Sequence, residues 1–96
     1  MLTYKAAYKF CDDGIHREVL DFPGVMTCGA TLAEVRRLLA STLTDTAQVE
    51  IDEGSPLPLP NPQASAPDFD LEEPIHLWLQ AATTVGVHAV DAGAAP

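Results

Sequence analysis

The chain has no lysine or arginine after Arg37, although it continues to residue 96. All five basic residues lie within the first 37 positions, where five acidic residues balance them. The other nine acidic residues are unopposed, so the later part of the chain carries the whole net charge of −9. Such a surface repels nucleic-acid phosphates and attracts a basic protein partner. A role in solubility explains the same acidity equally well.

Cysteine and clustered histidine are also scarce. The chain has two cysteines, no CxxC pair and three scattered histidines, His16, His76 and His88. A disulfide scaffold or a zinc site needs more of these residues at closer spacing. The sequence therefore predicts neither a metal site nor a cofactor.

Long apolar runs are missing as well. No stretch approaches the ~18 apolar residues that cross a bilayer. The start, MLTYKAAYKFCDDG, carries charge early and lacks the apolar region of a signal peptide. We therefore expect a cytoplasmic protein with one domain over residues 1–80 and a tail over 81–96. Its core is modest, which favours help from an oligomer.

Alternating apolar and polar residues predict three strands, over residues 2–10, 15–20 and 25–29. An Asp-Asp-Gly turn joins the first two, and a Pro-Gly turn joins the second and third. Short links of this kind make an antiparallel meander, with its outer strands about 9–10 Å apart. Cys11 and Cys28 would then be too far apart for a disulfide.

A capping box, TLAE, predicts the start of a long helix. Thr31 can accept a hydrogen bond from the backbone N–H of Glu34, while the Glu34 side chain reaches back to Thr31. Apolar residues then occupy about half of the helical wheel as far as Val49. Glu50 falls within this apolar arc, so we expect the helix to fray or leave the core there, and Gly54 ends it.

Residues 55–74 hold six of the eight prolines and show no periodicity, which predicts an extended or poorly ordered linker. Residues 75–80, IHLWLQ, alternate again and predict a fourth strand. His76 and Trp78 lie on the face opposite its leucines. The tail adds at most a short strand over 85–90.

The order of these elements resembles the HicB family of bacterial antitoxins. Members typically have Asp-x-Pro-Gly, a short strand, Gly-x-Thr at the start of a helix, and a Gly-x-Pro-x-Pro element after it. The matching residues are Asp21, Pro23, Gly24, Gly29 and Thr31, with a looser match at Gly54, Pro56, Pro58 and Pro60. The resemblance covers residues 2–62, with 75–80 as a returning strand.

The resemblance implies an α+β fold of the partial ribonuclease-H-like kind. In it, one helix packs across a three-stranded antiparallel meander, and a fourth strand returns beside the first. That strand is expected to run parallel to the first, through a right-handed crossover. The implied function is to bind and occlude a HicA-type toxin, which is a small basic ribonuclease.

One departure from the family concerns DNA. Many members carry a C-terminal DNA-binding module, whereas the 16 residues after Gln80 contain no lysine or arginine. We therefore expect no binding to operator DNA. A second departure is the linker, which is longer and more acidic than the family's short connection.

We predict an antitoxin-like binding protein without enzymatic activity. A metal-dependent nuclease needs several converging carboxylates, and the predicted strand interiors offer only Glu18. The alternative is a solitary, homo-oligomeric scaffold module of the same fold. The candidate partner-binding residues are acidic side chains of the helix end and the linker, namely Glu50, Asp52, Glu53, Asp68, Asp70, Glu72 and Glu73.

Two further surfaces carry predictions. His76 and Trp78 are candidates for an oligomer contact, with a partner anchored by Trp78 as the alternative. Lys5, Lys9 and Arg17 are expected on the solvated outer face of the sheet, with a basic patch as the alternative reading. We expect the protein to form at least a dimer.

Overall fold

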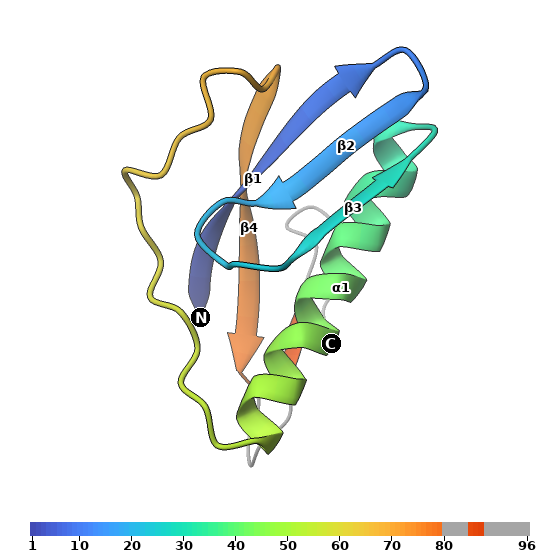
Figure 1. The fold of residues 1–96 in the computed structure, drawn as a ribbon. Coiled ribbons are helices and arrows are strands. Elements are labelled where there is room, and N and C mark those ends of the chain that lie inside the picture. The colour runs from blue at the N-terminus through green and yellow to red at the C-terminus, as the bar shows by residue number, and fades with distance from the viewer. Residues whose placement is uncertain (80–84, 88–96) are drawn as a thin grey trace.

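The computed structural model describes residues 1–79 and 85–87 (Figure 1). The strands pair in the order β3-β2-β1-β4-β5, and every neighbouring pair is antiparallel. The elements are β1 (Leu2–Cys11), β2 (Gly14–Val19), β3 (Met26–Gly29), α1 (Leu32–Asp52), β4 (Leu71–Leu79) and β5 (Val85–Val87). The predicted fold class, a meander with one helix across it and a fourth strand beside the first, is confirmed.

The core lies between α1 and the sheet. Its buried residues are Tyr4, Ala6, Tyr8, Val19, Phe22, Val25, Val35, Leu39, Leu43, Ala47, Ile75 and Leu77. Phe10, which sequence alternation places on the same face, is 51% exposed. Cys11 and Cys28 are free and exposed, as expected for strands that are not neighbours.

The link between β3 and α1 explains the Gly-x-Thr pattern. Thr31 Oγ1 accepts a hydrogen bond from Glu34 N at 3.1 Å, as the capping box predicts. The reciprocal bond differs, because Glu34 Oε1 accepts from Ala30 N (2.9 Å) and not from Thr31. A Cβ on Gly29 would lie 2.5 Å from Glu34 Oε1 and 2.8 Å from Val35 Cγ1. Glycine therefore allows the helix to begin directly against β3.

The end of α1 differs from the prediction. The helix does not fray at Glu50 but continues to Asp52, and Gly54 follows it with a positive φ of 77°. Val49 is 52% exposed, while Ile51 packs against the core instead. Within the described residues, no helix is both long and apolar enough to cross a membrane.

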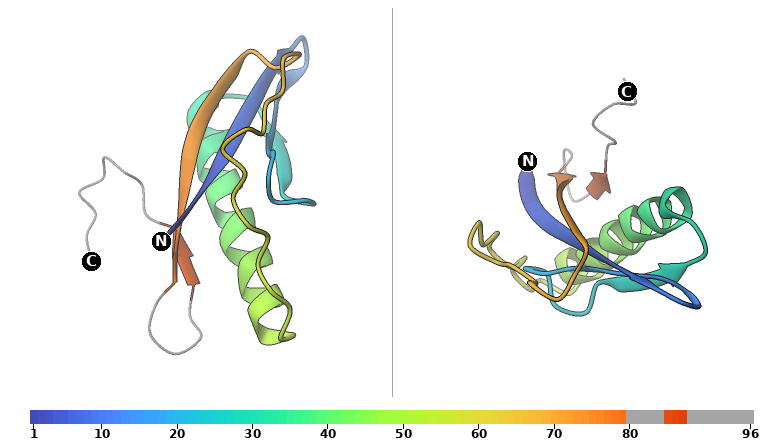
Figure 2. Two further views of the ribbon diagram at one scale, coloured as in Figure 1. Left: turned by 90° about the vertical axis from the view of Figure 1, so that its left-hand side faces the viewer. Right: turned by 90° about the horizontal axis from the view of Figure 1, so that it is seen from above.

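The direction of β4 is also a correction. It runs antiparallel to β1, with Leu2 opposite Leu77 and Tyr8 opposite Leu71. A short connection after α1 would bring the chain to the near end of β1 and make a parallel pair. Here the linker first runs back along the whole sheet, so β4 starts at the opposite end (Figures 1 and 2). The predicted right-handed crossover therefore does not arise.

β4 begins at Leu71, four residues inside the predicted linker, although it contains Pro74. Leu20 N donates to Lys5 O at 2.8 Å, so the backbone groups of Lys5 point towards β2. Those of its β4 partner, Pro74, therefore point away from β1. β5 pairs with β4 only from Leu77 onward. Among the described residues, no strand pairs with β4 beside Pro74, and a proline is tolerated on such an edge.

Candidate functional site

The linker forms a third layer on the face of the sheet opposite α1 (Figure 2). Ala7 belongs to that face, yet it is fully buried, because the linker covers it. Phe69 contacts the ring of His16 edge-on, with 5.9 Å between ring centroids. The predicted linker is therefore extended, but many contacts anchor it to β1 and β2.

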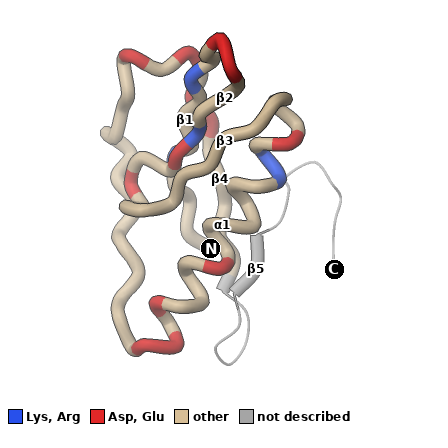
Figure 3. Tube along the Cα trace, turned by 45° about the vertical axis from the view of Figure 1, so that its right-hand side comes forward, with Lys and Arg blue, Asp and Glu red and all other residues tan. Residues whose placement is uncertain are grey.

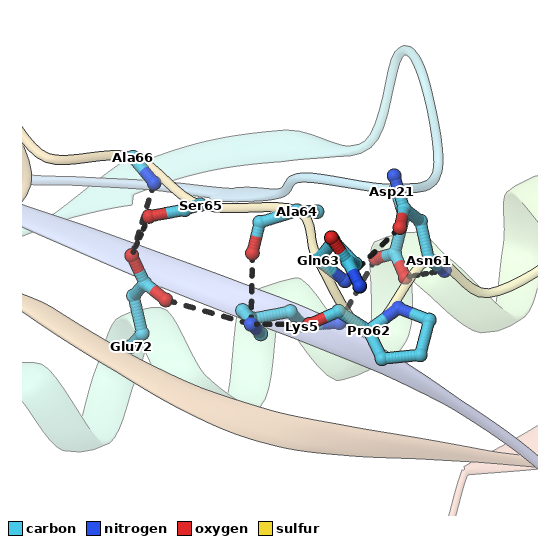
Figure 4. Close-up of polar contacts among 9 residues, drawn as sticks. All are labelled: Lys5, Asp21, Asn61, Pro62, Gln63, Ala64, Ser65, Ala66 and Glu72. Atoms are coloured by element: carbon cyan, nitrogen blue, oxygen red, sulfur yellow. Dashed lines mark hydrogen bonds and ion pairs between the residues drawn. The ribbon is translucent and has the colours of Figure 1, made fainter.

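Two lysines of β1 bind the linker through its backbone carbonyls. Lys5 Nζ donates to Ala64 O at 2.8 Å and to Pro62 O at 3.2 Å (Figure 4). Lys9 Nζ donates to Asp68 O at 2.6 Å. The lysines do lie on the outer face, as predicted, but the protein's own linker occupies them.

Asp21 joins three segments of the chain. One carboxylate oxygen accepts from Lys5 N at 2.9 Å and the other from Asn61 N at 2.8 Å (Figure 4). The aspartate of the Asp-x-Pro-Gly pattern therefore ties the turn to both β1 and the linker. The turn pattern in the sequence does not by itself predict these two contacts.

An open groove of about 490 Å³ lies beside these contacts. Its lining residues are Thr3, Tyr4, Lys5, Asp21, Asn61, Pro62, Glu72, Glu73 and Pro74. Glu72 Oε2 accepts from Ala66 N at 3.0 Å, and Glu72 Oε1 lies 3.8 Å from Lys5 Nζ. The carboxylates of Asp21 and Glu72 at the groove are thus occupied by the linker and β1.

Glu73 lies on the other face of the sheet, below α1. It accepts from Arg36 Nη2 at 2.8 Å and Arg36 Nε at 3.1 Å, and Tyr8 Oη also donates to it. Arg17 Nη2 lies 3.5 Å away. Glu73 therefore links α1, β1 and β2 to β4, and it is not part of a linker.

Arg17 does not lie on the solvated outer face of the sheet, where the sequence analysis expected it. It is only 2% exposed and lies below the helix, with its guanidinium carbon 4.0 Å from the centroid of the Tyr8 ring. Its Nε and Nη1 atoms are buried without a hydrogen-bond partner in the described structure. The signal was present, because Arg17 alternates in phase with Ile15 and Val19.

The cluster has a defined charge state. Burial lowers the pKa of Arg17 to about 10 and raises the pKa of Tyr8. Burial by itself would raise the pKa of Glu73, but hydrogen bonds from Arg36 and Tyr8 and the two guanidinium charges lower it. At neutral pH the group therefore holds two cations, one carboxylate and a phenol that donates.

The seven candidate partner-binding acids fall into two groups. Asp70, Glu72 and Glu73 hold the fold together, since Asp70 accepts from Phe10 N at 2.7 Å. The other group comprises Glu50, Asp52 and Glu53 at the end of α1, and Asp68 in the linker. No basic residue lies in the last turn of α1 (Figure 3).

His76 and Trp78 share the outer face of β4. His76 Nδ1 lies 3.0 Å from Thr3 Oγ1 on β1, and Trp78 is 41% exposed opposite Gly86 of β5. Their role in an oligomer stays a prediction. Among the described residues, no group of three or more His, Cys, Asp or Glu side chains is placed to hold a metal ion.

These features define a single-sheet α+β protein whose own linker covers the outer face. No protein-family model matches the chain, and no curated protein matches it significantly. Among solved structures, the fold is similar to a chain of a "HicA3 and HicB3 toxin-antitoxin complex", with a TM-score of 0.54. The two share 21% identity, and the match covers 62% of this chain and 71% of that chain. At this identity the similarity concerns the fold.

Proposed function

We propose that the protein is an antitoxin-like binding protein that occludes a small basic ribonuclease of the HicA type. The observation that carries the proposal is the fold that it shares with a chain of a toxin-antitoxin complex. The pattern from Asp21 to Thr31 supports it, since Asp21, Gly29 and Thr31 each have a local role in the structure. The proposed role needs no catalytic group of its own.

The charge distribution suits a basic partner. Lys5, Lys9, Arg17 and Arg36 are held by contacts within the chain. Arg37 is the one lysine or arginine side chain for which the described structure shows neither an ion pair nor a hydrogen bond. The outward field is therefore acidic, and complementary charge speeds the encounter with a cationic protein.

The end of α1 is the surface we assign to that partner. Glu50, Asp52 and Glu53 lie at the negative end of the helix dipole, where each acidic side chain costs about 0.3–1 kcal/mol. A cationic surface docked there would relieve this repulsion. Asp68 lies near the other end of the linker, where its backbone oxygen accepts from Lys9, and it is not part of this surface (Figure 1).

The test is the rate of association with a HicA-type toxin encoded beside this gene. The variant Glu50→Gln/Asp52→Asn/Glu53→Gln should bind roughly tenfold more slowly at low salt, because electrostatic steering is reduced. Its rate should also depend less on salt. The control, Asp12→Asn/Asp13→Asn/Glu18→Gln, changes the net charge equally but lies elsewhere.

Three outcomes would count against the proposal. Failure of the protein to bind the toxin or to block its RNA cleavage defeats the function itself. Equal slowing by both triple variants would show that net charge acts and the helix end does not. Saturable nanomolar binding of the protein alone to its promoter at moderate salt would contradict the expected lack of operator binding.

The second candidate is the solitary homo-oligomeric scaffold, favoured by the exposure of Trp78 on a strand face. In this case His76 and Trp78 form the contact, and no toxin partner exists. Trp78→Ala should then lower the mass measured by light scattering. An unchanged mass would exclude Trp78 as the contact.

A further inference from the structure

β3 forms one edge of the sheet and pairs only with β2 in the described structure. Val19 N donates to Val25 O at 2.9 Å, so the backbone groups of Val25 point towards β2. Because these directions alternate along an antiparallel strand, the N–H and C=O groups of Met26 and Cys28 point outward. Each of these two residues thus presents a donor and an acceptor at the edge.

This edge lacks most of the features that usually prevent strand pairing. Residues Met26–Gly29 include no charged side chain and no proline, and their pairing with β2 shows no bulge. Met26 is 51% exposed, and Cys28 is exposed as well. Of the features that prevent strand pairing, β3 has only its short length of 4 residues.

We propose that two copies of the protein pair antiparallel through β3, around a two-fold axis at Thr27. Met26 then lies opposite Cys28 of the second copy, and these residues exchange two backbone hydrogen bonds on each side of the axis. Thr27 faces its own counterpart in the non-hydrogen-bonded position, where a pair of threonines is favourable. The strand is thus complementary to itself in this register.

The charge distribution favours a second copy of this chain as the molecule that pairs with the edge of β3. Two molecules of net charge −9 can approach most easily along an uncharged strip. On the outer face, the pairing continues the row from Glu18 and Met26 to Cys28 and His16 of the second copy. Glu18 therefore shares a row with a histidine and not with another acid. A basic partner would find no acidic side chain on this strand.

The first test is the mass in solution, measured by light scattering at about 100 μM. Wild-type protein and Cys28→Ser should both give twice the 10.2 kDa of one chain. Cys28→Pro removes an outward N–H without removing a bond to β2, so it should give a monomer with an unchanged circular dichroism spectrum. A monomeric wild type, or a dimeric Cys28→Pro variant, would overturn the proposal.

A second variant covers the case in which Cys28→Pro fails to fold. In a Cys11→Ser/Cys28→Ser background, Thr27→Cys places two thiols across the axis at roughly 4.5 Å between Cα atoms, within reach of a disulfide. Copper phenanthroline, which removes two electrons and two protons, should then link the copies covalently. Ala30→Cys in the same background is the control. Equal cross-linking of both variants would contradict the register.

This dimer does not depend on the proposed antitoxin function. It also differs from the predicted contact through His76 and Trp78, which lies near the other edge of the sheet. Trp78→Ala should leave the dimer mass unchanged if β3 is the contact. A monomeric Trp78→Ala variant would assign the dimer to β4 and refute pairing through β3.

Discussion

Glu73 takes part in most of the hydrogen bonds and ion pairs below α1. Its carboxylate accepts from Arg36 and Tyr8 and is the nearest anion to the buried Arg17. Arg17 has no second carboxylate and leaves two buried nitrogens without partners in the described structure. Removing the charge of Glu73 would leave Arg17 without compensation in an apolar setting.

We therefore expect Glu73→Gln to lower the free energy of unfolding by about 1–3 kcal/mol, the usual cost of an uncompensated buried polar group. The matched control is Glu72→Gln, whose ion pair with Lys5 is loose at 3.8 Å and partly exposed, and whose amide oxygen can still accept from Ala66 N. Such a pair contributes less than about 1 kcal/mol. Urea unfolding measures both. Equal losses would show that the cluster below α1 has no special role.

The same residue predicts a pH dependence. Because the pKa of Glu73 is lower in the folded chain than its ordinary value of 4.5, its stabilising contribution is complete above that pH. The contribution is lost as the pH falls through 4.5 towards the lower folded value. Urea unfolding between pH 7 and pH 3 should therefore show the gap between wild type and Glu73→Gln closing in acid. A gap that stays constant would contradict the assigned charge state.

Arg17 shows how far a sequence can predict such a cluster. Alternation with Ile15 and Val19 already places it on the core face, and grouping it with Lys5 and Lys9 by charge was the error. Its partner could not be found in this way. Glu73 comes from β4, and its position depends on a strand register that no local pattern contains.

At the scale of elements, the linker is the part whose behaviour differs most from its composition. Proline and acidic residues predict an extended chain, and extended it is. Its position on the sheet depends on single contacts from residues far away, above all the two backbone hydrogen bonds that Asp21 accepts. These contacts keep the linker against β1.

We expect Asp21→Ala to destabilise the fold by about 1–3 kcal/mol, because the mutation removes the acceptor of two backbone N–H groups. Amide hydrogen exchange should quicken at Lys5 and Asn61 and along the linker. Asp12→Ala, in the exposed turn between β1 and β2, should change stability by less than about 0.5 kcal/mol. Unchanged exchange at Asn61 would refute the anchoring role.

Patterns among neighbouring residues predicted the helix and the strands well. Contacts between residues far apart in the sequence could not be predicted. The cap at Thr31, the turn glycines and the strands of the meander follow from neighbouring residues. The antiparallel direction of β4 follows from the path of the linker, which depends on Asp21, Lys5 and Lys9 together. Composition alone predicts only that the linker is an extended connection, without these contacts.

At the scale of the whole molecule, the placement of the acidic side chains at the end of α1 lowers the stability of the fold. The acids at the end of α1 oppose the helix dipole and have no basic neighbour in the last turn. Of the remaining acids in the described structure, Glu18 lies in β2, Glu34 and Asp45 lie in α1, and the others lie in turns, in the linker or in ion pairs. This placement is what the cationic partner proposed above would require.

The variant Glu50→Gln/Asp52→Asn/Glu53→Gln should therefore raise the free energy of unfolding by about 1 kcal/mol in low salt. The gain should shrink as salt screens the charges. Urea unfolding at two salt concentrations is the measurement. A gain in stability combined with slower toxin association would be the signature of a binding surface, whereas a loss of stability would contradict the assigned electrostatics.

The antiparallel return of β4 also has a kinetic consequence. β1 is the central strand, and it joins a near neighbour on one side and a very distant segment on the other, since Leu2 lies opposite Leu77. Closing so long a loop carries an entropy cost before any contact repays it, and such topologies fold slowly. The meander and α1 can form from local contacts, so the folding rate should be set by the docking of β4. Until then, one side of β1 stays open to pairing with the wrong strand.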